Sequence, residues 1–351
     1  MKALQNLFDS IKPNFEKGGK WEKFHTLYEG HRTIAFAPDL VTKAKGAQIK
    51  DATDLKRIMI TVVIAMVPAL LFGILNVGQQ HFLATGEEVT WVDKAIFGAL
   101  AVLPTLVVSY AVGLLTEFTF CVIRNHPISE GYLVSGMLIA LVMPPFIPLW
   151  QVALATIFAV VIGKEVFGGT GMNVLNPALT IRAFLFFNWA AWMSGDKVWV
   201  HGAVDGVKAS NGVDAISGET ILGALAQNKP LPEHWDAMNS FFGFIPGSVG
   251  ETSTLLIVLS GLFLILTGIG SARIMISAVI GAVVMGLIFN GLVDSGVILE
   301  GTKFYSLMSF PYWQHLLVGG LAFGIVFMAT DPVSAAQTDK GKIIYGLLIG
   351  F

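Results

Sequence analysis

The sequence predicts an all-α polytopic membrane protein with about nine to ten transmembrane helices, several of them broken or re-entrant. Of the 351 residues, 54% are apolar and only 13% are charged, whereas a soluble domain carries about 25% charged residues. From Ile58 onward come apolar segments long enough to cross a bilayer, which takes about 20 residues. Several are short or interrupted, and broken helices at membrane depth are tolerated only where they line a cavity or cofactor site.

Nine apolar segments follow one another along the chain. They lie at about Ile58–Leu75, Ile96–Phe120, Tyr132–Met143, Trp150–Ile162, Pro177–Trp192, Thr252–Thr267, Ile274–Phe289 and His315–Met328, and a ninth begins near Ile343. The interruptions are Pro144-Pro145 and the glycines around Gly168-Gly169, since proline ends a helix and glycine weakens it. The last nine residues would span roughly 14 Å of a core of about 30 Å, so we expect the C-terminus to be clipped.

Charge divides the chain into parts. Residues 1–56 form a polar N-terminal tail without a secretory signal peptide, 57–351 form the transmembrane domain, and 193–250 form an extracytoplasmic loop. With the N-terminus in the cytoplasm, 17 Lys and Arg lie inside and five outside, or six against five without the tail. The six are Arg124, Lys164, Arg182, Arg273, Lys340 and Lys342.

Composition excludes several functions. The single cysteine, Cys121, excludes a disulfide within the chain and an all-cysteine iron–sulfur site made by this chain alone. The net charge of −2 and the absence of a basic stripe argue against nucleic-acid binding. No HExxH, Walker loop or GxGxxG-helix unit appears, so NADH is not bound by a recognised motif and no residue is assigned a catalytic role.

The loop Gly163–Ala178 is a candidate cofactor site. Its glycines let backbone approach a flat ligand closely, and Asn173 and Asn176 supply amide donors and acceptors. Pro177 suits the first turn of the next helix, with Asn176 as its N-cap. The alternatives are a cofactor or ion pocket at a half-helix end and a re-entrant turn whose asparagines satisfy backbone groups. Lys164-Glu165 reads as a simple interfacial ion pair.

Charged residues within a membrane are candidates for function because their burial is costly. Glu117 lies inside the second span, and the nearest base in sequence is Arg124, about two turns away. Asp331 precedes a proline and either serves the site or caps a turn. Phe323 and Phe327 lie one turn apart and form either an apolar constriction or ordinary packing.

Four strings together resemble one family. They are GKEVFGGTGMNVLNPAL, SGET at 217–220, FIPGSVGETST at 244–254 and MATDPVSAAQTD at 328–339. They are similar to the B subunit of the sodium-translocating NADH:quinone reductase, over essentially the whole chain. A sister family, the D subunit of the Rnf electron-transfer complex, shares the core and the flavin threonine but lacks such a long tail.

The resemblance implies a covalent flavin. The family's flavinylation box is D-x-x-S/T-G-A-S/T, and a flavin transferase esterifies its last residue with FMN. Asp214, Ser217, Gly218 and Thr220 match the box, while Glu219 stands where the family usually has alanine. A carboxylate there is expected to repel the donor or slow the transfer. Without the resemblance, the string reads as a turn whose polar side chains cap backbone groups.

The resemblance also implies further sites. The residues matching Asn173 and Asn176 contact a non-covalent riboflavin, the glycine matching Gly113 lies near the quinone region, and the acid matching Glu117 takes part in cation movement. Phe323, Phe327 and Asp331 are candidates for the rest of a sodium path. The implied fold is channel-like.

The implied function is a relay of electrons from NADH through FMN and riboflavin to quinone, coupled to outward sodium transport across the bacterial inner membrane. Its partners would be the other subunits of the reductase, a flavin transferase and quinone. The alternatives are an Rnf-type electron-transfer subunit and a non-redox solute channel or transporter of the same architecture.

Overall fold

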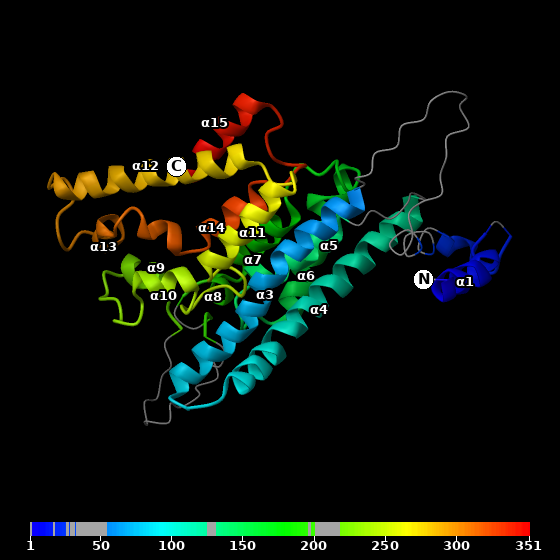
Figure 1. Ribbon diagram of the computed structural model, residues 1–351, viewed down its shortest axis with the longest axis horizontal. Coiled ribbons are helices and arrows are strands. Elements are labelled where there is room, and N and C mark those ends of the chain that lie inside the picture. The colour runs from blue at the N-terminus through cyan, green and yellow to red at the C-terminus, as the bar shows by residue number, and fades with distance from the viewer. Residues whose placement is uncertain are drawn as a thin grey trace.

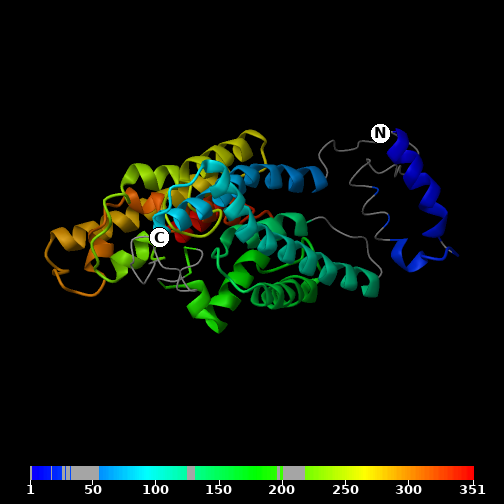
Figure 2. The ribbon, with the colours of Figure 1, turned by 90° about the horizontal axis from the view of Figure 1, so that it is seen from below.

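The computed structural model describes residues 2–16, 18–25, 28, 32, 55–124, 131–195, 198–200 and 218–351. Within these ranges the chain is helical and contains no strand. Asp214 and Ser217 lie outside the described residues. Figures 1 and 2 show a bundle of tilted helices, with α1 (Lys2–Ile11) standing apart from it at one end. Two short turns, η1 (Lys12–Asn14) and η2 (Glu22–Phe24), follow α1.

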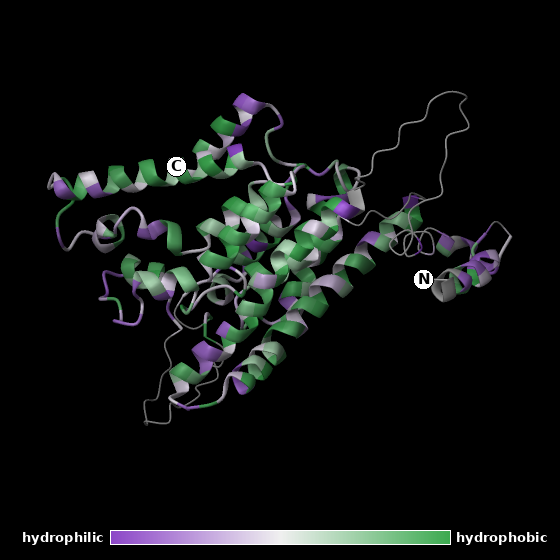
Figure 3. Cartoon of the chain, in the orientation of Figure 1, coloured by the Kyte–Doolittle hydropathy of each residue, from purple (hydrophilic) through white to green (hydrophobic). Residues whose placement is uncertain are grey.

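Four helices are long and apolar enough to cross a membrane. Within the described ranges these spans are Arg57–Thr85, Trp91–Arg124, Leu149–Phe167 and Ala272–Asp294. Two shorter apolar helices, Tyr132–Val142 and Thr254–Leu266, accompany them. The chain is therefore a helical membrane protein, as the composition predicts. Apolar residues predominate along the long helices, and polar residues are more frequent at their ends and in the loops (Figure 3).

Helices α3 (Leu55–Thr85) and α4 (Trp91–Arg124) form an antiparallel pair along one side of the bundle (Figure 1). Glycines set their close approach, because a Cβ at Gly78 would overlap the Lys94 carbonyl and one at Gly98 the Ile74 carbonyl. Small residues at such crossings are typical of membrane helices.

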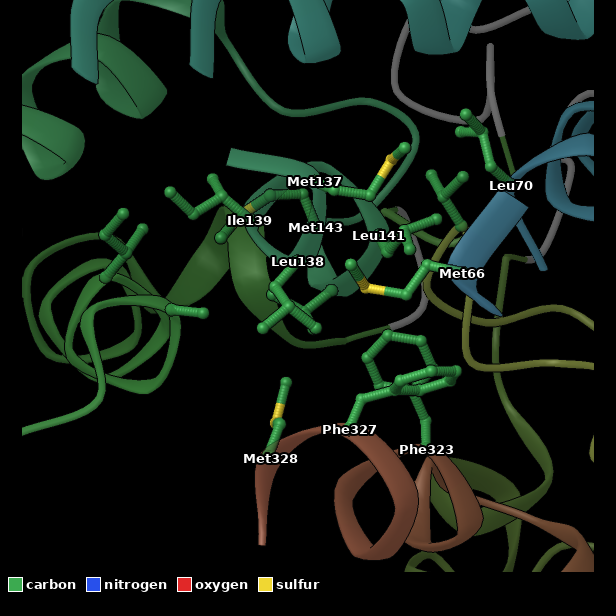
Figure 4. Close-up of a cluster of buried hydrophobic side chains, with 14 of the residues drawn as sticks. Met66, Leu70, Met137, Leu138, Ile139, Leu141, Met143, Phe323, Phe327 and Met328 are labelled. Atoms are coloured by element: carbon green, nitrogen blue, oxygen red, sulfur yellow. The ribbon is translucent and has the colours of Figure 1, made fainter. Parts of the chain in front are cut away.

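The core lies around α5 (Tyr132–Val142). Residues 136–142 of this helix are all buried, since α3, α4 and α7 (Pro177–Asn188) pack around it. Figure 4 shows its side chains facing Met66 and Leu70 of α3 and, across the core, Phe323, Phe327 and Met328. A helix buried on every side has no amphipathic pattern, which explains the continuous apolar run of this segment.

The predicted break at Pro144-Pro145 is confirmed, because α5 ends at Val142 and α6 (Leu149–Gly163) begins after Pro148. The carbonyls freed at the end of α5 have partners from a distant loop. Gly250 N–H donates to the Leu141 carbonyl at 2.8 Å and Val249 N–H to the Met143 carbonyl at 3.3 Å. Gly250 is required here, because a Cβ would overlap Leu141. The loop before α11 (Thr254–Leu266) is thereby fixed to the broken end of α5.

The second predicted break is also confirmed. After α6 come the turn η3 (Glu165–Phe167) and three glycines with positive φ, namely 123° at Gly168, 95° at Gly169 and 88° at Gly171. Helix α7 then starts at Pro177, with the Asn176 side chain accepting from Ala178 N–H at 2.9 Å. The predicted N-cap is therefore correct. The short helix α8 (Ala190–Met193) follows α7.

The loop predicted at 193–250 contains two short helices. They are α9 (Ile221–Ala226), capped by Thr220, and α10 (Ala237–Phe242), capped by Asp236. Both caps are side-chain oxygens that accept backbone N–H groups, as expected at helix starts.

The predicted continuous span His315–Met328 is wrong. The chain forms α13 (Tyr305–Ser309), the turn η4 (Gln314–Leu317), α14 (Leu321–Phe323) and the π-helical turn η5 (Gly324–Met328). Gly319 and Gly320, both at φ 72°, separate η4 from α14. Two successive left-handed residues cannot belong to a right-handed helix. The helical part that remains is short and buried in the core.

The last two long elements pack closely together. Helices α12 (Ala272–Asp294) and α15 (Asp339–Gly350) lie side by side at one edge (Figure 1). A Cβ at Gly281 would meet the Leu347 carbonyl, and one at Gly350 would meet the Ala278 carbonyl. The ninth apolar segment thus starts four residues before the predicted Ile343.

Candidate functional site

Two buried ion pairs join α4 to the end of α6. Glu117, near the C-terminal end of α4, bonds directly to Lys164, and the side chains of both are only 3% exposed. Arg124 donates to the Glu165 carbonyl at 2.7 Å and lies 3.5 Å from the Glu165 carboxylate. Lys164 and Glu165 are adjacent in the sequence, and each of them pairs with a different residue of α4.

This arrangement corrects two sequence interpretations. Lys164 and Glu165 do not pair with each other at an interface, and Arg124 is not the base that holds Glu117. Helical spacing along α4 points to Arg124 as the partner of Glu117. It cannot point to Lys164, because Lys164 lies 47 residues away from Glu117 in the sequence. Burying both charges is costly, so the pair requires close bonding to persist.

Gly113 makes room for an aromatic ring. A Cβ at this position would overlap the ring of Tyr132, whose hydroxyl donates to the Ser109 carbonyl at 2.8 Å. The Lys164 ammonium lies 5.9 Å from the centre of the same ring. Gly113 thus sets the position of Tyr132, and through it the surroundings of the Glu117–Lys164 pair. A quinone near Gly113 stays a prediction.

The asparagine pocket is a cavity of about 80 Å³ between α5, α7 and the segment after η5. Its polar lining comprises Ser135, Lys164, Thr170, Asn173, Asn176, Thr330 and Asp331. The Asn173 amide donates to the Leu175 carbonyl at 3.0 Å, and the Asn176 amide donates to Asp331 at 3.5 Å. Asn176 therefore both lines the predicted pocket and caps α7, so the two predicted roles do not exclude each other.

Asp331 also has two functions. Its carboxylate accepts from the Ser334 hydroxyl at 2.7 Å and from Val333 N–H at 3.2 Å, which is the turn cap that the following proline suggests. It lines the asparagine pocket at the same time.

Phe323 and Phe327 pack together in the core, with ring centroids 4.9 Å apart, as their spacing predicts. Both rings are buried, 0% and 4% exposed, and they face α3 and α5 (Figure 4). Phe327 also lines the asparagine pocket. The pair closes this side of the pocket with apolar surface, which is the geometry of a constriction and equally of ordinary packing.

The flavinylation string is described from Gly218 onward. Thr220 is half-buried, and its hydroxyl accepts from Gly223 N–H at 3.1 Å as the cap of α9. Glu219 is 8% exposed and bonds to Lys229 at 3.0 and 3.1 Å and to Gln227 at 2.7 Å. Its charge is neutralised within this cluster, which weakens the expectation that it repels a flavin donor.

The threonine pocket is a second cavity, of about 150 Å³, beside Thr220. Its lining includes Arg182 and Trp199 on one side, Ser248 and Glu251 on another, and the backbone of Gly319 and Gly320. Arg182 donates to Glu251 at 2.5 Å. Within the described part of the chain, the Ser248 hydroxyl is buried and has no hydrogen-bond partner, which is uncommon for a buried polar atom.

Arg182, one of the six charges placed on the inner side outside the tail, lies inside α7 and lines the pocket of Thr220. Without Arg182, the charges outside the tail balance at five to five, so the predicted orientation depends on the N-terminal tail.

The two pockets are lined by different residues of the same two elements. Asn176 caps α7, and Arg182 lies six residues later, about 9 Å along the helix at 1.5 Å per residue. The segment from Gly319 to Asp331 likewise begins at the threonine pocket and ends at the asparagine pocket. Phe323 and Phe327 lie on this segment between them.

A third cavity, of about 560 Å³, lies between α11, α12 and residues 316–326. No charged side chain lines it, so it suits only an apolar chain. Within the described ranges, no group of three or more His, Cys, Asp and Glu side chains is placed to hold a metal ion.

Comparison with known proteins now bears on this geometry. Residues 42–351 match the model of the NQR2, RnfD, RnfE family. The chain belongs to this family.

Named relatives narrow the choice within the NQR2, RnfD, RnfE family. The chain is 43% identical to the B subunit of the Na(+)-translocating NADH-quinone reductase of Chromohalobacter salexigens, over 99% of the chain and 85% of the relative. It is 44% identical to the protein of the same name in Ectopseudomonas mendocina and 40% identical to that of Klebsiella pneumoniae, over 99% of the chain and 88% of each relative. These names agree with the resemblance stated from the motifs.

We predict that Lys164→Met destabilises the protein by about 3–5 kcal/mol, because a buried carboxylate loses its bonded cation. Thermal unfolding in detergent measures this. The double variant Glu117→Gln with Lys164→Met should recover much of the loss, since no buried charge is left without its partner.

Arg273→Gln is the matched control. Arg273 pairs with Asp339 at 2.5 Å, but the two side chains are 56% and 67% exposed, so its loss should cost less than about 1 kcal/mol. Equal destabilisation by Lys164→Met and Arg273→Gln would contradict a special role for the buried pair.

Proposed function

We propose that this chain is the flavin-carrying membrane subunit of a sodium-translocating NADH:quinone reductase, in the bacterial inner membrane with its N-terminus in the cytoplasm. Its function is to pass electrons from NADH, through FMN on Thr220 and riboflavin beside Asn173 and Asn176, to quinone, coupled to outward sodium transport. The other subunits of the reductase are its partners, and a flavin transferase modifies Thr220. The basic tail and the names of the relatives favour this over an Rnf-type subunit.

The observation that carries the proposal is that the same two elements line both pockets. Helix α7 and the segment from Gly319 to Asp331 both contact the threonine pocket and the asparagine pocket. Two redox groups held by the same short elements would lie close together at a fixed separation, which a solute channel does not require. This supports an electron relay over the non-redox alternative.

The residues present suit the two flavins. In the threonine pocket, the Arg182 guanidinium and the unpartnered Ser248 hydroxyl are donors suited to a phosphate. In the asparagine pocket, the side-chain oxygen of Asn173 and the second amide N–H of Asn173 and of Asn176 remain for the donors and acceptors of a flavin edge. A cavity of about 80 Å³ has room for one edge of such a ring. When bound, the flavins supply the redox chemistry, while the protein supplies orientation and electrostatics.

Sodium passage would use the buried charges. Glu117 is held by Lys164, which also lines the asparagine pocket. A cation that replaces Lys164 at the Glu117 carboxylate would leave the ammonium free to turn towards that pocket. We propose that Glu117 takes part in sodium movement, and that Phe323, Phe327 and Asp331 border the path.

Thr220→Ala should abolish the covalent flavin when a flavin transferase is coexpressed, because no hydroxyl remains to form the ester. In-gel fluorescence after denaturation detects only covalent flavin. Ser217→Ala should leave part of the band. A fluorescent band of full intensity in Thr220→Ala would sink the assignment.

Glu219→Ala serves as a companion in the same experiment. Because Glu219 is already neutralised by Lys229, we expect the modified fraction not to rise. A clear rise would instead support obstruction by the carboxylate.

Asn173→Leu and Asn176→Leu should each lower the riboflavin content and the rate of quinone reduction, while the covalent FMN is retained. Each change leaves a polar group of the ligand without its partner, a loss of about 1–3 kcal/mol. Extracted flavins, separated by chromatography, give the riboflavin content.

Asn176→Ser separates the two functions of Asn176. Serine is a good N-cap but has no amide, so this variant should fold normally and still lose riboflavin. If riboflavin content and turnover stay normal in all three variants, the asparagines are caps only and the pocket lies elsewhere.

Glu117→Gln should weaken the sodium dependence of turnover more than it lowers expression, because the amide keeps the shape but not the charge. Quinone reduction is measured against sodium concentration in reconstituted vesicles, with membrane potential recorded alongside. Arg124→Gln is the control, since Arg124 pairs with Glu165. A wild-type sodium curve and potential in Glu117→Gln would make Glu117 a structural acid.

A further inference from the structure

The threonine pocket contains polar groups that the fold leaves incompletely used. The Ser248 hydroxyl is 3% exposed and has no hydrogen-bond partner among the residues that the structure describes, and a buried donor without a partner costs about 1–3 kcal/mol. It lies in the same cavity as Thr220 and Arg182. Such an orphan at a cavity wall indicates a ligand that accepts a hydrogen bond there.

Arg182 provides the charge of this cavity. Its side chain is 35% exposed and donates to Glu251, whose side chain is 8% exposed. A guanidinium carries five N–H donors in a planar fork, and the bond to Glu251 uses one N–H of a terminal nitrogen. The remaining donors suit a second oxyanion, and arginine is well matched to phosphate geometry.

The backbone of Gly320 gives Glu251 the room in which it holds Arg182. Gly319 and Gly320 both have φ of 72°, and a Cβ at Gly320 would come within 2.7 Å of the Glu251 carboxylate. Glu251 can therefore pack directly against this backbone. Glu251 and Ser248 belong to the loop that is fixed to the end of α5 by Val249 and Gly250. The cavity thus has a firm scaffold before any group occupies it.

We propose that Arg182 is the positioning residue for the phosphodiester that links FMN to Thr220, with the Ser248 hydroxyl as a second donor and Glu251 as the residue that orients Arg182. This rests on the proposed function, because it requires a flavin on Thr220. In the transfer, the bond from the threonine oxygen to phosphorus forms as the pyrophosphate bond of a flavin dinucleotide breaks. A nucleoside monophosphate leaves, and the threonine proton passes to solvent. Arg182 faces the negative charge of the product phosphodiester.

The alternative is that Arg182 and Glu251 only join α7 to the loop before α11. Single variants cannot separate the two roles, because Arg182→Gln would leave Glu251 buried without its cation. The double variant Arg182→Gln with Glu251→Gln removes both charges and lets the two amides bond to each other. A purely structural pair would be restored by this exchange, whereas a phosphate-binding arginine would not.

The experiment uses the full chain, coexpressed with its flavin transferase, and follows covalent FMN by in-gel fluorescence over time. Arg182→Gln and the double variant should both slow the transfer by roughly tenfold or more, as expected for the loss of a charge-assisted hydrogen bond. Arg182→Lys should recover part of the rate, because it keeps the charge without the fork. Ser248→Ala should slow the transfer less than Arg182→Gln does.

A second measurement is the midpoint potential of the covalent FMN, recorded on the part of each variant that carries the flavin. Loss of the positive charge should move the midpoint potential of the covalent FMN to lower values, because a nearby cation stabilises the reduced, more anionic flavin. Arg273→Gln, which removes an exposed arginine, should leave both transfer rate and potential unchanged. A double variant with the wild-type rate and potential would overturn the role of Arg182. Absence of any flavin on Thr220 in the unaltered chain would overturn the proposed function itself.

Discussion

The need to satisfy every backbone polar group inside a membrane governs this structure, because no water is present to replace a lost hydrogen bond. At two of the helix breaks, the backbone groups that the break leaves free form hydrogen bonds with other residues. The end of α5 accepts N–H groups from Val249 and Gly250, and the start of α7 is capped by Asn176. These repairs bring the loop before α11 against α5 and the glycine loop against the segment after η5. Both pockets lie where such repairs occur.

The same cost applies to charges, and the buried ones pair across distant segments. Glu117 bonds Lys164, Glu165 meets Arg124, and Arg182 meets Glu251. Two of these pairs lie beside the asparagine pocket or the threonine pocket. Charged side chains therefore line both pockets, and Phe327 adds an apolar surface to the asparagine pocket.

Much of the helical outline was predictable, because long apolar runs and prolines act locally. The breaks at Pro144-Pro145 and at the glycine loop, the cap at Asn176 and the meeting of Phe323 with Phe327 follow from spacing within a few residues. The partner of Glu117 was not predictable, since Lys164 lies on another element and Arg124 was nearer in sequence. The span predicted at His315–Met328 failed because Gly319 and Gly320 leave the helix within an apolar run. The hydropathy of a residue carries no information about the left-handed backbone conformation that these two glycines adopt. Arg182 and Ser248 were missed because one lies inside an apolar helix and the other in a glycine-rich loop.

A structure of the assembled complex with density for its cofactors would show whether α7 and the segment from Gly319 to Asp331 hold two flavins in adjacent pockets. We expect a flavin joined to Thr220 with its phosphate at Arg182 and Ser248, and a second flavin against Asn173 and Asn176. Density for the flavin on Thr220 that turns away from Arg182, or a second flavin remote from α7, would contradict it.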